Sequence, residues 1–439
     1  MTNPSEEQLR REARRRMLKR RHHRQLFQVV AVIVVVLFFA NLLTRSREYS
    51  DTENRSLAQK PGIMAGGLRD GTYFKDFDTY YSDQFVLRDQ FVKLKFIGNW
   101  LLHIRESSGV LIGKDKYQFE IPVTPDEKQV KSAAKKINAF YNLDQGIATR
   151  MMIVPGSAAV LTDKLPANAA VRDQAKDIKQ FYEEIDDGID TIDVTGILKR
   201  SDPENLYYRT DHHWTSGGAF TVFKAVAAKL GIEAPVGYDH YTVSTSFKGT
   251  LSSKTGDFVG KDSVEIYAPK SEKVNYYVVY PSAKEKRSSI FKPEMLKTKD
   301  KYTVFFGGNH PLVEINTTAD TGRNLLVLKD SYANSFMQFL TPYYDKIIMV
   351  DPRYYYDNLN MVLSNYDINE ILYLYSADTL FSDTSLSDAL EAAIEAKTEE
   401  EKKEKKAKKK EKEAEQTDAE SPETQDETSG QEAEPSEGE

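Results

Sequence analysis

Three short segments near the C-terminal end of the chain consist only of apolar and tyrosine side chains: Leu325–Leu328, Ile347–Val350 and Ile371–Tyr375. Segments of helical character, near 333–340 and 359–363, separate them. Strands that are apolar on both faces and alternate with helices form parallel sheets covered by helices on both sides. The pattern therefore predicts an α/β fold, with these strands at the centre of a parallel sheet.

Helix and strand patterns also alternate upstream. The predicted elements are a helix over 126–141, a strand over 151–154, a helix over 171–185, a strand over 191–194 and a helix that follows residue 215. Residues 236–306 differ, because they are rich in tyrosine, valine, serine and threonine, which favours antiparallel strands. We therefore predict a three-layer α/β domain over 121–390, with a β-rich insertion over 236–306.

The N-terminal region has the composition of a membrane anchor. Leu26–Leu43 is an apolar run broken only by Gln28 and Asn41, close to the ~20 residues that a helix needs to cross a bilayer. Arginines and lysines cluster before it, which predicts a cytoplasmic segment over 1–25, a transmembrane helix over 26–44 and an extracellular remainder. A cleaved signal peptide has a similar layout, but the run is long and no small-residue cleavage pattern follows it. Topology accounts for the basic cluster, so we expect no nucleic-acid partner.

Two further segments flank the predicted domain. Residues 45–120 carry Phe74, Phe77 and Tyr81 at helical spacing and are predicted to form a juxtamembrane helical segment. Residues 397–439 lack every aromatic and large aliphatic side chain and are rich in charge, which predicts a disordered tail with a frayed helix at its start. The chain has no cysteine, which excludes disulfides, thiolate metal sites and a cysteine nucleophile.

Ser331 follows one of the buried strands and precedes a predicted helix. Functional groups collect at the carboxyl ends of strands in an open parallel sheet. A serine there presents its hydroxyl beside backbone N–H groups that have no partner within the helix and can stabilise an oxyanion. Serine and aspartate are also ordinary N-cap residues, so Ser331 and Asp330 have a purely structural interpretation as well.

The segment Asp211-His212-His213-Trp214 places an acid and two imidazoles next to one of only two tryptophans. A serine nucleophile needs an imidazole to take its proton, and a carboxylate to hold that imidazole in the correct tautomer. Asp211 and His213 lie two residues apart, which points their side chains the same way in an extended segment. Trp214 could pack beside such a site and exclude water.

Other interpretations of this cluster stay open at this stage. The histidines could be buried and satisfied at the start of a helix. Asp, His and His can also ligate zinc, although three adjacent residues rarely converge on one ion and no partner motif such as HExxH is present. The bare Asp-His-His also suggests the DHH phosphoesterases, but their further acidic metal-binding motifs are missing. We therefore expect neither a metal nor another cofactor.

The segment 208–219 and the downstream Lys329-Asp330-Ser331-Tyr332 together resemble the DHHW proteins of Gram-positive bacteria. These proteins are similar to the circularly permuted SGNH-hydrolase-like domains of the alginate O-acetyltransferase proteins AlgX and AlgJ. The resemblance covers roughly 50–385. It also includes Glu53-Asn54-Arg55, the segment 305–311 and Val350-Asp351-Pro352-Arg353.

The resemblance implies a catalytic triad with Ser331 as nucleophile, His213 as general base and Asp211 as orienting acid. His213 is preferred over His212, because the related Asp-Thr-His-Trp form has a threonine at the latter position. The remaining candidates for oxyanion or substrate contacts are Gly308, Asn309, Arg353 and Trp214. The chain departs from the usual Gly-Asp-Ser pattern, since Lys329 stands where the glycine is expected.

The resulting hypothesis is a membrane-anchored, extracellular O-acyltransferase or esterase that adds or removes acetyl groups on a cell-surface polysaccharide. If it transfers acetyl groups, the resemblance implies a membrane-bound O-acyltransferase as the partner that supplies them. The alternative is a non-catalytic glycan-binding or assembly protein that has kept an SGNH-like fold. Geometry discriminates between the two, because a working triad requires His213 within about 3 Å of both Ser331 and Asp211.

Overall fold

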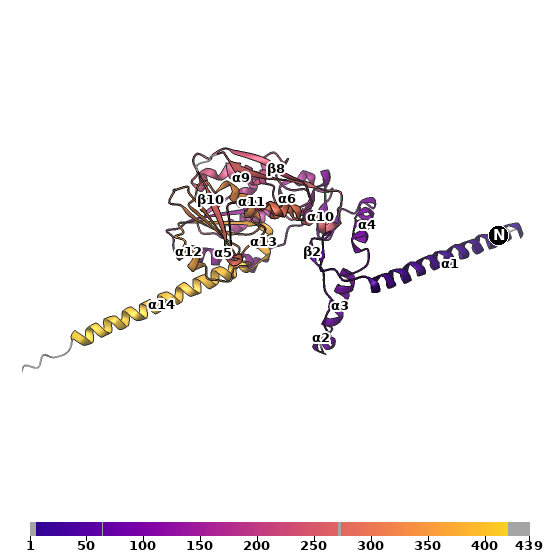
Figure 1. The fold of residues 1–439 in the computed structure, drawn as a ribbon, viewed down its shortest axis with the longest axis horizontal. Helices are drawn as coiled ribbons and strands as arrows, with labels where there is room; N and C mark the ends of the chain where they lie inside the picture. Colours follow the sequence, from indigo (N-terminus) through magenta and orange to yellow (C-terminus); the bar gives the residue numbers. More distant parts are fainter. Residues whose placement is uncertain (1–5, 64, 271–273, 420–439) are drawn as a thin grey trace, which may run out of the picture.

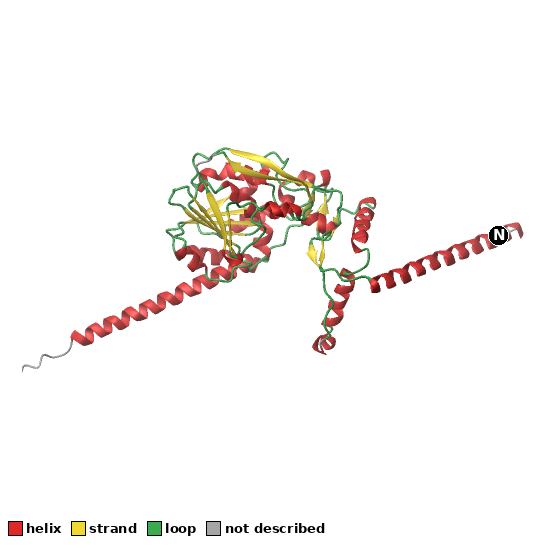
Figure 2. Ribbon diagram, in the orientation of Figure 1, coloured by secondary structure: helices red, strands yellow, loops and turns green. Residues whose placement is uncertain are grey.

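The computed structural model describes residues 6–63, 65–270 and 274–419. Its centre is an eight-stranded sheet with the order β11-β10-β12-β14-β13-β15-β6-β7. The strands of this sheet are β6 Ala148–Val154, β7 Asp190–Ile192, β10 Tyr276–Tyr280, β11 Glu285–Arg287, β12 Leu312–Thr317, β13 Asn324–Lys329, β14 Lys346–Val350 and β15 Glu370–Ser376. Helices cover the sheet on both sides, which gives the predicted three-layer α/β fold (Figures 1 and 2).

Five strands, β14, β13, β15, β6 and β7, form the parallel part of the sheet. β13 lies between β14 and β15, with Leu326 opposite both Ile348 and Ile371. Alternate side chains of β13 enter different cores, since Leu325 and Val327 belong to one and Leu326 and Leu328 to the other. Burial on both faces explains why the segment is uninterruptedly apolar.

The helices form two outer layers, one on each face of the sheet. The helices of the domain are α5 Glu127–Tyr141, α6 Ser157–Val160, α7 Gln174–Tyr182, α8 Val194–Lys199, α9 Ser216–Val226, α10 Thr250–Thr255, α11 Tyr332–Phe336, α12 Leu359–Asn365, α13 Ala377–Ser382 and α14 Ser385–Ala419. The core on one face includes side chains of α5, α7, α12, α13 and α14, and the core on the other includes those of α6, α8, α9 and α11. The active-site candidates lie on loops beside the second group.

The predicted β-rich insertion separates into two parts. β8 Tyr238–Phe247 and β9 Asp262–Pro269 pair as an antiparallel ribbon of their own. In contrast, β10 and β11 continue the central sheet at its antiparallel edge through β12. The sequence pattern predicted the strands, but it did not show that they would join two different sheets.

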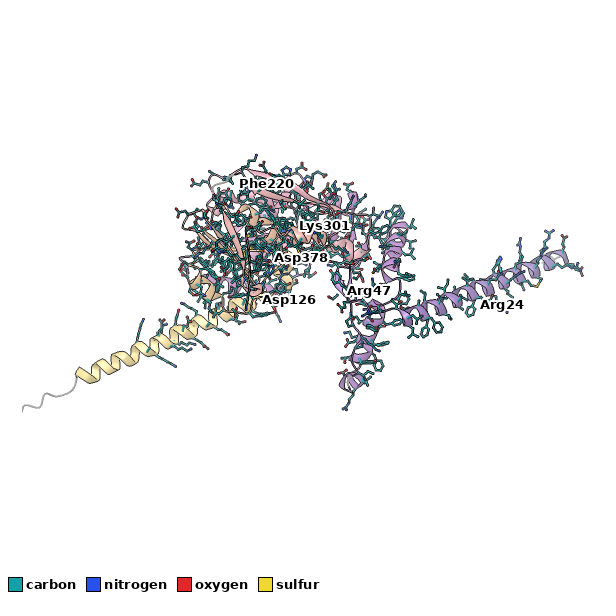
Figure 3. All side chains as sticks on the ribbon, viewed as in Figure 1. Arg24, Arg47, Asp126, Phe220, Lys301 and Asp378 are labelled. Atoms are coloured by element: carbon teal, nitrogen blue, oxygen red, sulfur yellow. The ribbon has the colours of Figure 1, made fainter. Side chains whose placement is uncertain are left out.

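The N-terminal region consists of one long helix and a short helical segment. α1 Glu6–Leu43 is continuous, and its part from Ala13 to Leu43 is long and apolar enough to cross a membrane. In the view of Figure 3, α1, which carries the labelled Arg24, extends away from the domain. The short helices that follow are α2 Ala65–Asp70, α3 Thr72–Asp83 and α4 Arg88–Leu101.

A network of ion pairs holds the linker that connects α1 to the domain. The linker contains the two-residue strands β1 Tyr49–Ser50 and β2 Arg55–Ser56, which pair with each other. Arg55 donates to both carboxylate oxygens of Asp83 at the end of α3, and Arg88 of α4 donates to both oxygens of Glu53. The Arg55 hydrogen bonds lower the pKa of Asp83 to about 2. These contacts account for the Glu53-Asn54-Arg55 motif.

The strands β3 Glu106–Ser107, β4 Val110–Ile112 and β5 Gln118–Glu120 form a small antiparallel sheet between the short helices and the domain. Leu111 and Phe119 belong to one of the two domain cores. The backbone N–H of Gln118 donates to the carbonyl oxygen of Arg209 at 2.8 Å. This sheet therefore packs as part of the domain, although its residues fall within the predicted juxtamembrane segment.

The helix at the start of the C-terminal tail is longer than the frayed helix that the sequence predicts. Residues 397–419, the first part of the predicted disordered tail, continue α14 beyond the domain (Figure 1). Alanine, lysine and glutamate have high helix propensity, and the pair Glu401–Lys405 at the i,i+4 spacing adds a weak favourable contact. Helix propensity thus extends a helix whose packed part, near Leu386 and Leu390, nucleates it. The rest of the predicted tail, 420–439, lies outside the described residues.

Candidate active site

Ser331 lies at the carboxyl end of β13, where the chain turns into α11. Asp330 fixes this turn, because one of its carboxylate oxygens accepts from the backbone N–H of Tyr332 at 2.9 Å. The other oxygen accepts from the backbone N–H and hydroxyl of Ser376, at 3.0 and 2.6 Å. Asp330 is fully buried and so joins the end of β15 to the start of α11, while Ser331 is half-buried.

Asp211 and His213 lie on a tight loop that precedes α9. The loop is closed by a bridge between Tyr207 and Trp214 and by a hydrogen bond from the backbone N–H of Tyr208 to the carbonyl oxygen of His213. Trp214 is completely buried, and its indole N–H donates to the carbonyl oxygen of Tyr332 at 3.0 Å. This bond ties the histidine loop directly to the residue that follows Ser331.

The structure brings Asp211, His213 and Ser331 into one hydrogen-bonded chain. His213 Nε2 lies 2.8 Å from Ser331 Oγ, and His213 Nδ1 lies 2.6 Å from Asp211 Oδ1. A carboxylate can only accept, so Nδ1 carries the proton and Nε2 is free to accept from the serine hydroxyl. The distances meet the geometric requirement that the sequence hypothesis set for a triad.

Burial and neighbouring groups lower the pKa values of both His213 and Asp211. Burial, followed by repulsion from His212, lowers the pKa of His213, so the imidazole is neutral and basic at neutral pH. Burial acts to raise the pKa of Asp211, but attraction to both histidines and its hydrogen bonds hold it well below its usual range. The pair is therefore a carboxylate beside a neutral imidazole, which is the state that a general base requires.

Residues that the sequence did not single out support the acid and the base. Thr250 donates to Asp211 Oδ2 from its backbone N–H at 2.7 Å and from its hydroxyl at 3.0 Å. The neighbouring Gly249 permits this close approach, because a Cβ atom there would lie 2.2 Å from the Cβ of Asp211. The ring of Tyr302 stacks on His213 at 3.9 Å, and its hydroxyl donates to the carbonyl oxygen of Ser331 at 2.8 Å.

His212 takes a supporting position beside the triad. Its Nδ1 lies 2.8 Å from the hydroxyl of Thr250, which itself donates to Asp211. The ligand atoms of Asp211, His212 and His213 lie within 4.8 Å of one another, so the three residues do converge, contrary to the sequence argument against a metal. However, Asp211 Oδ1 faces His213 Nδ1, and His213 Nε2 faces Ser331. The arrangement favours a hydrogen-bonded triad over a three-ligand metal site.

Asn309 and Lys329 form a second polar group at the same end of the sheet. The buried Lys329 ammonium donates to Asn309 Oδ1 at 3.2 Å and to Asn334 Oδ1 at 2.8 Å, and it lies 3.7 Å from Asp351. Burial lowers the pKa of Lys329 to about 8. With its oxygen held by Lys329, the amide of Asn309 has its N–H groups available for a ligand. The substitution of lysine for the usual glycine thus adds a support for Asn309.

The other candidates have clear positions. Gly308 has a φ of 107° and completes a turn in which Phe306 and Gly307 also have positive φ. The backbone N–H of Gly308 donates to the carbonyl oxygen of Phe305 at 3.2 Å, so that N–H is already used. Trp214 cannot contact a substrate, because it is completely buried. Its role is to join the two halves of the triad.

Arg353 lies at the edge of the site. Its guanidinium donates to both carboxylate oxygens of the buried Asp351, at 2.8 and 2.7 Å. It also lines a cavity of about 290 Å³, together with His212, Tyr332 and Asp378. The cavity adjoins the triad at His212, and Glu120, Asp378 and Asp383 line it as well. Arg353 is therefore, with Asn309, a candidate that stays placed for a substrate contact.

Comparison with known proteins agrees with this architecture. Residues 114–308 match the family described as the SGNH hydrolase-like domain of the acetyltransferase AlgX. The predicted resemblance is confirmed. The matched range contains Asp211 and His213 and ends before Ser331. Over 201 residues, 40% of the chain, the protein is 25% identical to the probable alginate O-acetylase AlgJ of Pseudomonas aeruginosa. The match spans 47% of that relative, just under half of its length.

Solved structures of similar fold cover more of the chain than the family match does. A DHHW family protein from Eubacterium siraeum is 21% identical, with a TM-score of 0.55, and the match covers 64% of this chain and 95% of that one. Bacillus cereus PatB1 is 18% identical, with a TM-score of 0.54, over 63% of this chain and 98% of that one. A second structure of PatB1, with a TM-score of 0.53, carries a sulfonyl adduct. At these identities the likeness shows the fold alone. The SGNH-like description, which agrees with the prediction, comes from the family match over residues 114–308.

Proposed function

We propose that this protein is a membrane-anchored, extracellular O-acyltransferase or esterase that uses Ser331, His213 and Asp211 to move acetyl groups on a cell-surface polysaccharide. The observation that carries the proposal is the unbroken hydrogen-bonded chain from Asp211 through His213 to Ser331. Its position at the carboxyl end of a parallel strand, in an SGNH-like fold, adds support. The similarity to a probable alginate O-acetylase favours acetyl as the group and a polysaccharide as the substrate.

The reaction would proceed through an acyl-enzyme. Ser331 Oγ attacks the carbonyl carbon of the acyl donor while His213 Nε2 takes the hydroxyl proton. The tetrahedral intermediate collapses, and the donor's leaving oxygen departs with that proton. An acceptor hydroxyl then attacks the acyl-serine, gives its proton to His213, and His213 returns a proton to Ser331. A sugar hydroxyl as acceptor gives transfer, and water gives hydrolysis.

In the proposed mechanism, two groups would stabilise the negative charge of the intermediate. The backbone N–H of Ser331 stands at the start of α11 and donates to no acceptor among the residues that the structure describes. The side-chain N–H groups of Asn309 are the second donor, since Lys329 and Asn334 both bind its oxygen. Donors that are fixed before the reaction stabilise developing charge without reorganisation.

The proposed cellular setting rests on α1 and the basic residues that precede its apolar part. With its basic N-terminus in the cytoplasm, α1 would hold the domain at the outer surface of the membrane. Acetyl donors are made in the cytoplasm, so a transferase on the outer surface needs a second protein to deliver the acyl group. A membrane-bound O-acyltransferase is the partner that the proposal implies.

The test uses the full-length chain in detergent with a chromogenic acetyl ester. We expect Ser331→Ala and His213→Gln to lower the initial rate at least ~10³-fold, because each removes a triad member. The matched controls are Ser364→Ala and His240→Gln, which alter exposed residues far from the triad in sequence and should retain full activity. A sulfonyl fluoride should label the peptide that contains Ser331 and spare it in His213→Gln. Chelator treatment should leave the rate unchanged.

An acceptor assay separates transfer from hydrolysis. Incubation with the ester and an oligosaccharide should give acetylated sugar by mass spectrometry, and the product should disappear in Ser331→Ala. If wild type and both triad variants are equally inactive toward esters but bind the oligosaccharide equally well, the protein is a glycan-binding protein on an SGNH-like fold.

A further inference from the structure

Six large apolar side chains line one face of the helices α3 and α4 and remain exposed. They are Phe74, Phe77 and Tyr81 on α3, and Phe91, Leu94 and Leu101 on α4, with exposed fractions between 40% and 63%. We call them the apolar face. Their spacing of three, four and seven residues places them on the same side of each helix. An exposed apolar surface of this kind marks a place where another molecule binds.

The opposite sides of the same helices are already used. On α3, Asp83 is buried and binds Arg55 of the linker. On α4, Val92 packs so closely on Gly256 that a Cβ atom there would lie 2.5 Å from a Val92 methyl, and Phe96 meets Phe258 with ring centroids 6.2 Å apart. The apolar face therefore points away from the domain.

The corner between α3 and α4 is attached to the end of α1. The backbone N–H of Val86 donates to the side-chain oxygen of Asn41 at 2.7 Å, and Asn41 lies in the last turn of α1. The hydroxyl groups of Ser46 and Tyr80 are 2.9 Å apart, and Arg47 pairs with Asp89 at 2.9 Å. The corner is thus fixed at the point where α1 would leave the bilayer.

The direction of the helices fits this position. In the view of Figure 1, α3 and α4 leave the end of α1 on opposite sides and run crosswise to it, with the domain beyond them. A bilayer that is spanned by α1 would lie parallel to α3 and α4. Phenylalanine, tyrosine and leucine on one exposed helix face, with charged side chains such as Lys95 nearby, are typical of helices that lie in a membrane interface.

We propose that α3 and α4 lie flat in the outer lipid–water interface, with the apolar face inserted among the lipid acyl chains. The inference rests on the membrane anchorage contained in the proposed function. Lipid is favoured over a second copy of the chain, because the lipids that surround α1 at Asn41 must also meet the attached corner at Val86. Lys95, which is exposed beside Leu94, can extend its ammonium group to the lipid phosphates.

The test exploits the absence of cysteine from the chain, which allows single nitroxide labels without further mutation. Phe77→Cys and Leu94→Cys place a label on the apolar face. Met361→Cys is the matched control, because Met361 lies on α12 of the domain and is 56% exposed, close to the 60% of Leu94. The labelled full-length protein is reconstituted in phosphatidylcholine–phosphatidylglycerol liposomes, and collisions with oxygen and with a water-soluble nickel chelate are measured.

We expect the ratio of oxygen to nickel collisions to be severalfold higher at residues 77 and 94 than at 361, because oxygen concentrates in acyl chains and the chelate stays in water. Equal ratios at all three positions would overturn the inference. Labels on the apolar face that are shielded from both reagents would also overturn it, since protein would then cover the face.

Flotation of the same liposomes separates this outcome from a failure of the anchor. If the protein floats with the liposomes after a carbonate wash but its labels report water, the anchor stands and only the interfacial helices are refuted. If it does not float, the proposed anchorage itself is wrong. Circular dichroism of each labelled variant should match the parent chain, which confirms that the label leaves the fold intact.

Discussion

Replacing Asp211 with asparagine is the sharpest test of the proposed chemistry, because it changes charge and hydrogen bonding with almost no change of shape. Four donors surround the carboxylate. Oδ1 accepts from the ring Nδ1–H and backbone N–H of His213, at 2.6 and 3.1 Å, and Oδ2 accepts from the N–H and hydroxyl of Thr250, at 2.7 and 3.0 Å. An amide has only one oxygen, so its NH₂ group must face one of the two pairs.

The structure indicates which pair of donors, that of His213 or that of Thr250, would face the NH₂ group and lose its acceptor. The backbone N–H of Thr250 makes the shorter of the two backbone bonds and cannot change its role, whereas the His213 ring can move its proton to the other nitrogen. The amide therefore keeps its oxygen toward Thr250 and turns its NH₂ toward Nδ1. His213 then carries its proton on Nε2, where it can no longer accept the proton of Ser331. A wrong tautomer in a serine triad costs about 10⁴-fold in kcat, or ~5.5 kcal/mol of transition-state stabilisation.

The assay is the initial rate of acetyl ester hydrolysis by Asp211→Asn, with saturation kinetics to separate kcat from KM. We expect kcat to fall by about 10⁴ and KM to change little, because Asp211 does not face the substrate. Retained near-ultraviolet circular dichroism would show that the fold is intact. If the folded variant keeps more than about a tenth of wild-type kcat, then Asp211 does not set the tautomer and the reasoning is refuted.

The remaining predictions concern the base, the oxyanion donor and the buried core. Burial lowers the pKa of His213, and only the neutral imidazole can accept a proton. The pH profile of kcat/KM should therefore reach half its maximum below pH 6.5. A midpoint well above pH 6.5 would contradict the assignment of His213 as the base. Asn309→Ala should lower kcat about 10²–10³-fold if its amide stabilises the oxyanion, and Lys329→Met should give a smaller loss of the same kind, with neither changing KM much. Trp214→Phe leaves the carbonyl of Tyr332 without its donor and should lower the free energy of unfolding in urea by about 1–3 kcal/mol; an unchanged value would mean that this bond does not support the site.

The sequence was sufficient to predict the buried strands of the parallel sheet and to single out the three residues of the proposed triad, because each leaves a local signal. Leu326 and its neighbours are apolar on both faces, and Asp211 and His213 stand two residues apart in a loop. The residues that hold the proposed base and acid in place could not be predicted in this way. Tyr302 and Thr250 reach His213 and Asp211 from distant parts of the chain, and neither is unusual in its local sequence.

Lys329 and Trp214 show how burial changes the meaning of a residue. A lysine before Asp330 looked like a departure from a pattern, but its position within the sheet makes it a donor that orients Asn309. From the sequence, Trp214 was expected to pack beside the site. In the structure its side chain is completely buried below the site. Whether a side chain points into a core or a cleft depends on the packing of elements far apart in sequence. The tail over 397–419 is a third case, where strong helix propensity outweighed low hydrophobicity.

The linker's ion pairs have a consequence for how the protein searches for substrate. A flexible tether would let a catalytic domain sweep through a volume set by the length of its chain. Here Glu53 and Arg55 hold the linker to Arg88 and Asp83, and Lys299 of the domain binds Ser253 and the carbonyl oxygen of Thr52 in the linker. The linker is therefore a rigid connection between α1 and the domain and not a flexible tether. If α1 anchors the protein as proposed, Ser331 would be held at a fixed distance from the membrane surface. The polysaccharide would then have to move along the site to be modified at successive positions.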